Sequence, residues 1–378
     1  MNSKERVSAV LSGKRADKVP LGFYLVDCDI IEKVIGRKTF VRNNIGKRLA
    51  LAAGRRDEVA DSLKEDTVEF YRKIDCADII LPKEAELLPP KDYEPEKLEK
   101  IDDCRYKDGA GRIWQVSPVE NAMLCVQDPT IRNNFTKEEF ESPFEVKPID
   151  DSCFEAVDYL IQELGKDKHI CSKADFTVMP WLGGFDTGMM LYASDPDIVY
   201  AANKRITATH NALDICNIRK GTDSIFIEND MGGTNGPFIS PRMFRELCLP
   251  FMRERVNHLK KFHEHVLLHS CGRNIDLVDM YIESGICCYQ SLQTTTGMNI
   301  DILKNRFGGR ISFWGGISLE VLIGGTTDDA RKEVRNALEQ GNGGGFILGP
   351  SHSIAYGTKY DNFMALLDEF VKLRDKYN

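Results

Sequence analysis

The sequence predicts an α/β protein, a (β/α)8 TIM barrel in which residues 1–378 form a single domain. A chain of 378 residues is long enough for one barrel of this type with additions. From residue 150 onward, short apolar runs alternate with segments of helical periodicity, which predicts parallel strands joined by helices. Polar residues follow several apolar runs, as in barrels whose functional groups lie at the strand ends. A doubly wound open sheet is the alternative fold.

The first 150 residues are less regular. Ser3 is expected to cap a first helix over residues 6–11, followed by a strand at 21–26, a helical region at 40–70 and a strand at 76–81. Residues 84–107, rich in Pro, Asp, Glu and Lys, predict an exposed loop with one short helix. A turn at residues 108–109 predicts a hairpin with a strand at 112–116. We expect residues of about 84–150 to be an N-terminal helical and loop insertion that covers one end of the barrel.

The remaining chain predicts a regular alternation of elements. The expected helices are 154–164, 198–218, 241–262, 275–284, 300–306, 328–340 and 361–377. The expected strands are 169–174, 224–227, 265–270, 287–292, 311–314 and 346–348. The run Gly343-Gly344-Gly345 precedes a strand instead of following one, so we interpret it as a turn and not as a dinucleotide-binding loop.

Composition excludes several classes of protein. The formal net charge of -8 argues against a general nucleic-acid role. No apolar run approaches the ~20 residues that a membrane span needs. The N-terminal residues carry no apolar signal-peptide core, so we expect a cytoplasmic protein without a membrane partner. The eleven cysteines are then expected to be reduced thiols.

The stretch Val266–Gly272 carries the clearest chemical signal. Its first three residues are apolar and predict a buried strand, and Gly272 allows a sharp turn after it. His269 and Cys271 are two positions apart, so in an extended segment their side chains point to the same face. An imidazole and a thiolate together suit zinc, although a packed histidine and thiol are the structural alternative.

Polar residues at the ends of other predicted strands would meet this pair at one end of a barrel. Such a titratable ring is typical of an enzyme, although each member has a structural alternative as a helix cap or a loop hydrogen-bond partner. The ring is expected to contain Asp175, Glu228, Asp230, His269, Cys271, Gln290, Gln293 and His352.

Several segments together resemble the uroporphyrinogen decarboxylase superfamily. They include residues 226–241, the His-Ser-Cys-Gly of 269–272, residues 285–298, the Phe-Trp-Gly-Gly of 313–316 and residues 344–352. Near the N-terminus, Lys-Glu-Arg at 4–6 and Asp-Lys-Val-Pro at 17–20 also fit. The resemblance covers nearly the whole chain and implies a (β/α)8 barrel.

The superfamily contains two chemistries. True decarboxylases have an Arg-rich N-terminal segment that clamps substrate carboxylates, whereas residues 21–29 here contain no arginine and two acids. The chain is more similar to the cobalamin-dependent methyltransferases, whose His-x-Cys pair binds zinc with a later cysteine. His269 and Cys271 match that pair, but no cysteine follows Cys288, so Glu228 or His352 is expected to be the third ligand.

The resemblance therefore implies a zinc-assisted methyltransferase that moves a methyl group between a small thiol, methoxylated or methylated compound and a corrinoid carried by a partner protein. Expected catalytic residues are Glu228, Asp230 and His352, with Glu228 as an acid for a leaving oxygen. The residues expected to bind substrate are Asp27, Asp175, Gln290, Gln293 and Trp314. The alternatives are a decarboxylase or lyase that uses Asp27, Asp29 or Asp230 as its acid, and a barrel that binds a corrinoid or tetrapyrrole without chemistry.

Overall fold

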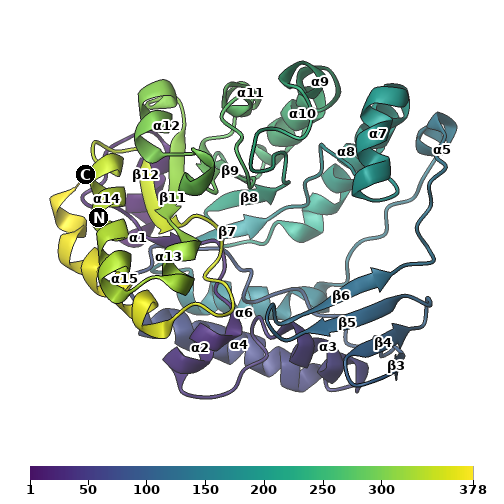
Figure 1. Cartoon of the computed structure of the whole chain (residues 1–378), viewed down its shortest axis with the longest axis horizontal. Helices are drawn as coiled ribbons and strands as arrows, with labels where there is room; N and C mark the ends of the chain where they lie inside the picture. Colours follow the sequence, from purple (N-terminus) through teal and green to yellow (C-terminus); the bar gives the residue numbers. More distant parts are fainter. Residues whose placement is uncertain (378) are drawn as a thin grey trace.

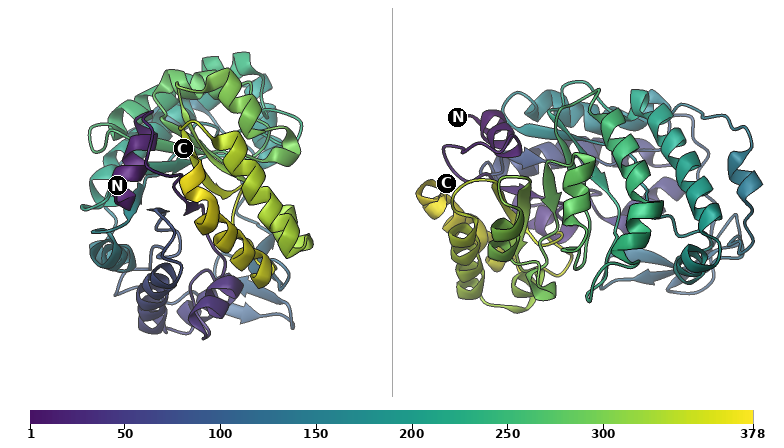
Figure 2. Two further views of the ribbon diagram at one scale, coloured as in Figure 1. Left: turned by 90° about the vertical axis from the view of Figure 1, so that its left-hand side faces the viewer. Right: turned by 90° about the horizontal axis from the view of Figure 1, so that it is seen from above.

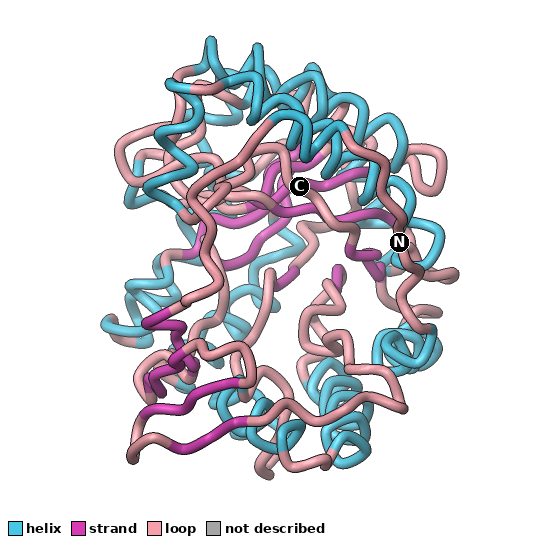
Figure 3. The backbone as a smooth tube through the Cα atoms, turned by 90° about the vertical axis from the view of Figure 1, so that its right-hand side faces the viewer, coloured by secondary structure: helices cyan, strands magenta, loops and turns pink. Residues whose placement is uncertain are grey.

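A parallel eight-stranded sheet, closed into a barrel, forms the centre of the computed structural model, which describes residues 1–377 (Figures 1 and 3). Isolated bridges from Leu21 to Leu348 and from Val26 to Ile354 join the first strand to the last, so the sheet has no open edge. This confirms the predicted (β/α)8 barrel over the open sheet. Around the barrel the order is β1 (Gly22–Phe23), β2 (Ile79–Ile80), β7 (His169–Lys173), β8 (Ser224–Glu228), β9 (Val266–His269), β10 (Cys288–Gln290), β11 (Ser312–Ile317) and β12 (Phe346–Pro350).

Helices surround the barrel on its outside (Figures 1 and 2). The structure splits the predicted helical regions at 40–70 and 241–262 into two helices each, and it adds α2, α5, α7 and α13, which we did not predict. The helices are α1 (Ser3–Leu11), α2 (Cys28–Ile35), α3 (Asn44–Ala52), α4 (Arg56–Lys73), α5 (Lys137–Glu141), α6 (Glu155–Leu164), α7 (Phe185–Ser194), α8 (Pro196–Asn217), α9 (Pro241–Leu247), α10 (Leu249–Leu259), α11 (Val278–Ser284), α12 (Ile300–Phe307), α13 (Leu319–Gly324), α14 (Thr327–Gly341) and α15 (Tyr360–Leu373).

The N-terminal cap of α1 differs from the prediction. Asn2, not Ser3, is the capping residue, and it forms a capping box with Glu5. Ser3 instead donates a hydrogen bond to Asp78, 2.8 Å away. Asp78 is buried and also forms ion pairs with Arg6 and Arg374, so one carboxylate ties α1 and the C-terminal end of the chain to the strand β2.

The irregular N-terminal region contains a small antiparallel sheet, of strands β3 (Leu98–Lys100), β4 (Arg105–Asp108), β5 (Ile113–Ser117) and β6 (Ala122–Gln127) (Figure 1). The predicted hairpin is confirmed as β4 and β5. The short helix expected within residues 84–107 is wrong, because the described residues there form β3, β4 and turns. The Arg48 guanidinium lies 3.8 Å from the Trp114 ring centroid and packs this sheet against α3.

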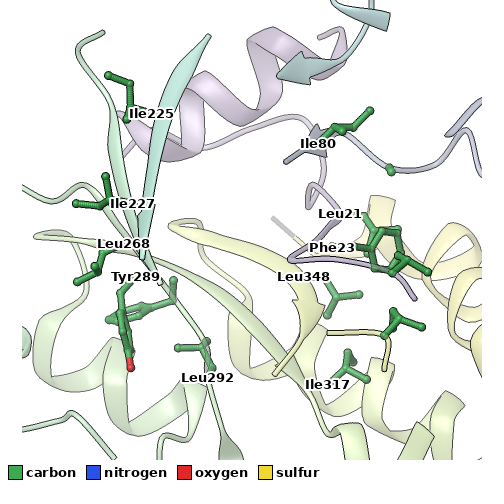
Figure 4. Packing of buried hydrophobic residues seen from close by; sticks show 14 of the residues in the cluster. Leu21, Phe23, Ile80, Ile225, Ile227, Leu268, Tyr289, Leu292, Ile317 and Leu348 are labelled. Carbon is green, nitrogen blue, oxygen red and sulfur yellow. The ribbon is translucent and has the colours of Figure 1, made fainter. Parts of the chain in front are cut away.

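Side chains alternate between the inside and the outside of the barrel, as successive strand residues must. Ile225, Ile227 and Leu268 belong to the large core between the strands and the helices (Figure 4). Phe226 and Trp314 belong to a second cluster that also includes apolar residues of α1. The helix α1 therefore packs on the interior of the barrel where the strands begin, which leaves the opposite end for the polar ring.

All eleven cysteines are free of disulfides. Within residues 1–377, none of the helices combines the length and the apolar character that crossing a bilayer would require.

Candidate active site

Three of the predicted residues come together where the strands end. His269 is the last residue of β9, Cys271 follows two positions later, and His352 lies two positions beyond β12. Their nitrogen and sulfur atoms all lie within 4.8 Å of one another. Cys271 Sγ is 3.2 Å from His269 Nε2. The geometry therefore favours His352 over Glu228 as the third member of the group.

Gln290 orients the imidazole of His269. The two residues are paired in register on neighbouring parallel strands, and His269 Nδ1 is hydrogen-bonded to Gln290 Oε1. Because the amide oxygen can only accept, Nδ1 carries the proton and Nε2 presents its lone pair towards Cys271. Burial lowers the pKa of His269 to about 4, so the ring is neutral at physiological pH. We predicted that Gln290 binds substrate, whereas its burial and its contact with His269 favour a positioning role.

Tyr24 fixes the same imidazole from its face. The rings of Tyr24 and His269 stack with centroids 3.9 Å apart and an angle of 9° between their planes. His352 meets the edge of Tyr24, with centroids 5.3 Å apart. Sequence reasoning missed Tyr24 because the predicted strand, 21–26, runs past it; in the structure β1 ends at Phe23 and Tyr24 follows directly.

Glu228 is held by a different set of groups. The Tyr24 hydroxyl donates to Glu228 Oε2 at 2.7 Å, Lys83 forms an ion pair with the same oxygen, and Lys173 Nζ lies 3.4 Å from Oε1. Burial opposes ionisation, but the two lysines and these hydrogen bonds lower the pKa of Glu228 to about 2. Glu228 is thus a carboxylate paired with two cations, an arrangement that favours neither the acid role nor the metal-ligand role that we expected for it.

Lys83 is a second residue that the sequence analysis missed. Its ammonium donates to the Tyr24 hydroxyl at 2.5 Å and is mostly buried. Burial lowers the pKa of Lys83, although the ion pair with Glu228 opposes this shift. Lys83 follows Pro82, directly after the predicted strand at 76–81, so the signal that could have found it was its place at a strand end.

Cys271 and Asp230 lie side by side at the mouth. The Cys271 amide donates to Asp230 Oδ1 at 2.8 Å, and the same oxygen lies 3.8 Å from His269 Nε2. The Asp230 side chain is 56% exposed, so this carboxylate faces solvent. Burial, followed by the charge of Asp230, raises the pKa of the Cys271 thiol to about 12. Without a nearby cation, this thiol therefore stays protonated at neutral pH.

These observations test whether the residues fit a zinc ion. One sulfur and two nitrogens are donors that zinc prefers, and three protein ligands are typical of a catalytic zinc site that keeps a position open. His269 is neutral, and Gln290 holds it in the tautomer that a metal ligand needs. The donor set fits zinc, with His352 in place of the later cysteine that the resemblance led us to expect.

The other predicted substrate residues divide between the mouth and the interior. Asp27 lies directly before α2, pairs with Arg42 at 3.2 Å and accepts from the Tyr356 amide, and Gln293 accepts from the Gly272 amide at 2.6 Å. Both hold loops around the site. Trp314 is fully buried inside the barrel and donates to the Gly22 carbonyl at 3.2 Å, a position that favours a core role over the substrate contact that we expected.

Asp175 lines a cleft of about 310 Å³ together with Lys83 and Lys173. Arg42 and Glu86 are also part of its wall. Both lysines contact Glu228, so this cleft adjoins the group of residues around Tyr24. The cleft is the cavity nearest to the metal-ligand candidates that we can define from the described residues, and it is lined by more cations than anions.

Comparison with known proteins agrees with this architecture. The profile of the family described as Uroporphyrinogen decarboxylase (URO-D) matches residues 122–373. No curated protein matches the sequence. Among solved structures, the chain is similar to a methyltransferase from Methanosarcina mazei, with a TM-score of 0.64, 17% identity and 99% coverage of each chain. It also matches a putative vitamin-B12 independent methionine synthase from Listeria monocytogenes, with a TM-score of 0.45, 11% identity, and coverage of 95% of this chain and 96% of the other. The family match spans more than half of the sequence, and the chain therefore belongs to the uroporphyrinogen decarboxylase (URO-D) family.

Proposed function

We propose that this protein is a methyltransferase that moves a methyl group between a small substrate and a corrinoid carried by a partner protein, with the help of a zinc ion. The observation that carries the proposal is the convergence of His269, Cys271 and His352 within 4.8 Å at the end of the barrel where the strands terminate. The fold shared with the methyltransferase from Methanosarcina mazei is consistent with it. The corrinoid in this proposal is inferred from the sequence resemblance to the cobalamin-dependent methyltransferases.

His269, Cys271 and His352 would hold the zinc ion. When bound, zinc supplies a Lewis acid that stabilises a substrate thiolate or a leaving oxygen. Asp230 is the solvent-facing carboxylate beside Cys271, with Oδ1 placed to receive the proton that a substrate thiol must lose. The expected catalytic role of Asp230 is therefore retained in the proposal.

Lys83 and Tyr24 replace Glu228 as the proposed proton donors. Tyr24 keeps its proton at neutral pH, because burial and the charge of Glu228 raise its pKa, and Lys83 forms an ion pair with Glu228. The Lys83 ammonium releases its proton more readily than an exposed lysine does, because burial lowers its pKa. Glu228 accepts hydrogen bonds from both groups and holds them in place. If the methyl donor has an oxygen leaving group, that oxygen would receive a proton from Lys83 or Tyr24.

A decarboxylase remains the second candidate, and the cleft favours it. Lys83, Lys173 and Arg42 line its wall, and such cations can hold substrate carboxylates even though the N-terminal segment lacks arginine. A decarboxylase would release carbon dioxide without a corrinoid or zinc. The two functions are therefore separated by the products and by the requirement for the metal.

The test is demethylation of methylcobalamin, followed by absorbance, with a panel of small thiols and methoxylated compounds. Wild-type protein should turn over at least one of them, and Cys271→Ser should lower the rate by about 100-fold or more, the size of effect expected for loss of a metal ligand. Cys125→Ser is the matched control, because this cysteine is exposed on β6, and it should keep full activity. Full activity of Cys271→Ser, or carbon dioxide release without corrinoid, would contradict the proposal.

A further inference from the structure

A second cavity lies at the opposite end of the barrel, where the strands begin. Its volume is about 550 Å³, and its lining includes Ile311 and Phe313 at the start of β11, Gly345 before β12 and Leu11 at the end of α1. That volume falls within the range of small-molecule binding sites. The residues of the proposed active site do not line it, so this cavity is separate from the methyl-transfer chemistry.

Positive charge dominates the lining of this cavity. Five cationic side chains contribute to it, against the single carboxylate of Glu264: Lys14, Arg15, Lys260, Lys304 and Arg310. Arg310 pairs with Asp279 at 2.9 Å, and Lys304 donates to the carbonyls of Gly341 and Asn342. Within residues 1–377, no carboxylate lies close enough to Lys14, Arg15 or Lys260 to form an ion pair. Three cations around this cavity therefore have no ion-pair partner among the described residues.

The cations are also crowded. Burial, and then the neighbouring Arg15 guanidinium, lower the pKa of the Lys304 ammonium. Burial also lowers the pKa of His265, which lines the same cavity; the charge of Glu264 opposes this shift and the charge of Lys260 adds to it. Like charges held together repel one another, so an anion bound between them would relieve this repulsion.

Glycines leave the backbone open on one side of the cavity. Gly309, Gly343 and Gly344 line it with φ angles of +77°, +96° and +89°, which favour glycine over other residues. A Cβ atom at Gly309 or Gly343 would meet nothing within 4 Å, so there is free space beside this backbone. Among the described residues, the amides of Gly343 and Gly344 donate to no backbone carbonyl. Free amides beside glycine are well suited to phosphate oxygens.

We propose that this cavity binds a small molecule that carries phosphate groups, with Arg15 and Lys260 as its principal cationic contacts. Several point charges and a forked guanidinium around one open cavity match the multiple oxygens of a di- or triphosphate better than they match a single carboxylate. The glycine run at 343–345, which the sequence alone indicated to be a turn, thereby gains a role in ligand binding. The site is independent of the proposed methyltransferase activity.

The test is isothermal titration of the full-length protein with pyrophosphate and with adenosine triphosphate, in a buffer of fixed ionic strength. Wild-type protein should bind at least one of them. Arg15→Glu and Lys260→Glu should each raise the Kd by about tenfold or more. Lys261→Glu makes the same change of charge on an exposed neighbour that does not line the cavity, and its Kd should stay within about twofold of wild type.

Two further measurements make the result decisive. Thermal unfolding of each variant without ligand should show a transition like that of wild type, because the exposed side chains of Arg15 and Lys260 support no part of the core. His352→Ala should bind the phosphate compound as wild type does, which separates this site from the active site. Absence of binding to wild-type protein at millimolar ligand, or equal weakening by Lys261→Glu, would overturn the proposal.

Discussion

Glu84 should make the stability of this protein depend on pH. Its side chain is fully buried, Oε1 accepts a hydrogen bond from the Val26 amide at 2.7 Å, and the buried Tyr71 hydroxyl is a further polar neighbour. This contact joins the end of β1, which carries Tyr24, to the segment that carries Lys83. Burial raises the pKa of the carboxyl from 4.5 to about 7, so the group keeps its proton in the folded state at mildly acidic pH.

The sign and the size of the effect follow from proton linkage. Between pH 4.5 and about 7 the folded protein holds a proton on Glu84 that the unfolded chain has released, so the free energy of unfolding falls as the pH rises. The stabilisation is fully present below pH 4.5 and is lost once the pH passes the folded-state pKa. At about 1.4 kcal/mol per pH unit, the total loss from Glu84 is about 3 kcal/mol.

The assay is urea unfolding at several pH values from 5 to 8, for wild-type protein and for Glu84→Gln. The amide cannot ionise, so the difference in stability between the two proteins should shift by about 3 kcal/mol in favour of Glu84→Gln as the pH rises. Histidines with lowered pKa values also titrate in this range, but they are common to both proteins and cancel in the difference. If the difference in free energy of unfolding between the two proteins is the same at every pH, the claim that folded Glu84 keeps its proton up to about pH 7 is refuted.

Three further substitutions test the contacts around the barrel. Asp78→Ala should lower the free energy of unfolding by about 3–5 kcal/mol, measured by urea unfolding, because it removes the carboxylate partner of buried Arg374 and one of the two carboxylates that pair with buried Arg6; a loss below about 1 kcal/mol would contradict this. Gln290→Ala should weaken zinc binding by about 10- to 100-fold in a chelator competition, because His269 loses the partner that fixes its tautomer; unchanged affinity would show that Gln290 orients nothing. Lys83→Met should raise the pKa of Glu228 above its value of about 2 and move the acidic limb of the pH–activity profile to higher pH; an unmoved limb would remove Lys83 from the site.

The sequence predicted the parts of the site that depend on local pattern. His269 and Cys271 are two positions apart at the end of an apolar run, and a strand there must present both side chains to one face. The alternation of strands and helices predicted the barrel. The helices α2, α7 and α13 were missed because they are additional to the single helix expected between consecutive strands. The sequence could propose His352 as a ligand. The preference for it over Glu228 comes from distances between side chains of different strand ends, which depend on the closed barrel.

The remaining errors concern residues whose role depends on distant partners. Lys83 and Glu228 are 145 positions apart, and the ionisation of Glu228 depends on that contact. Gln290 was placed correctly at a strand end, but its register opposite His269 makes it a hydrogen-bond partner of the imidazole instead of a substrate contact. The strand register places the Trp314 side chain inside the barrel, and a single sequence does not specify that register.

The metal content of the purified protein tests the central claim most directly. Elemental analysis of wild-type protein, prepared without chelators, should find about one zinc per chain. His352→Ala should lose that zinc, while Glu228→Gln should retain it, because Glu228 is paired with Lys83 and lies outside the cluster. Zinc-free wild-type protein, or zinc that is lost in Glu228→Gln and kept in His352→Ala, would contradict the assignment of His269, Cys271 and His352 as the metal site.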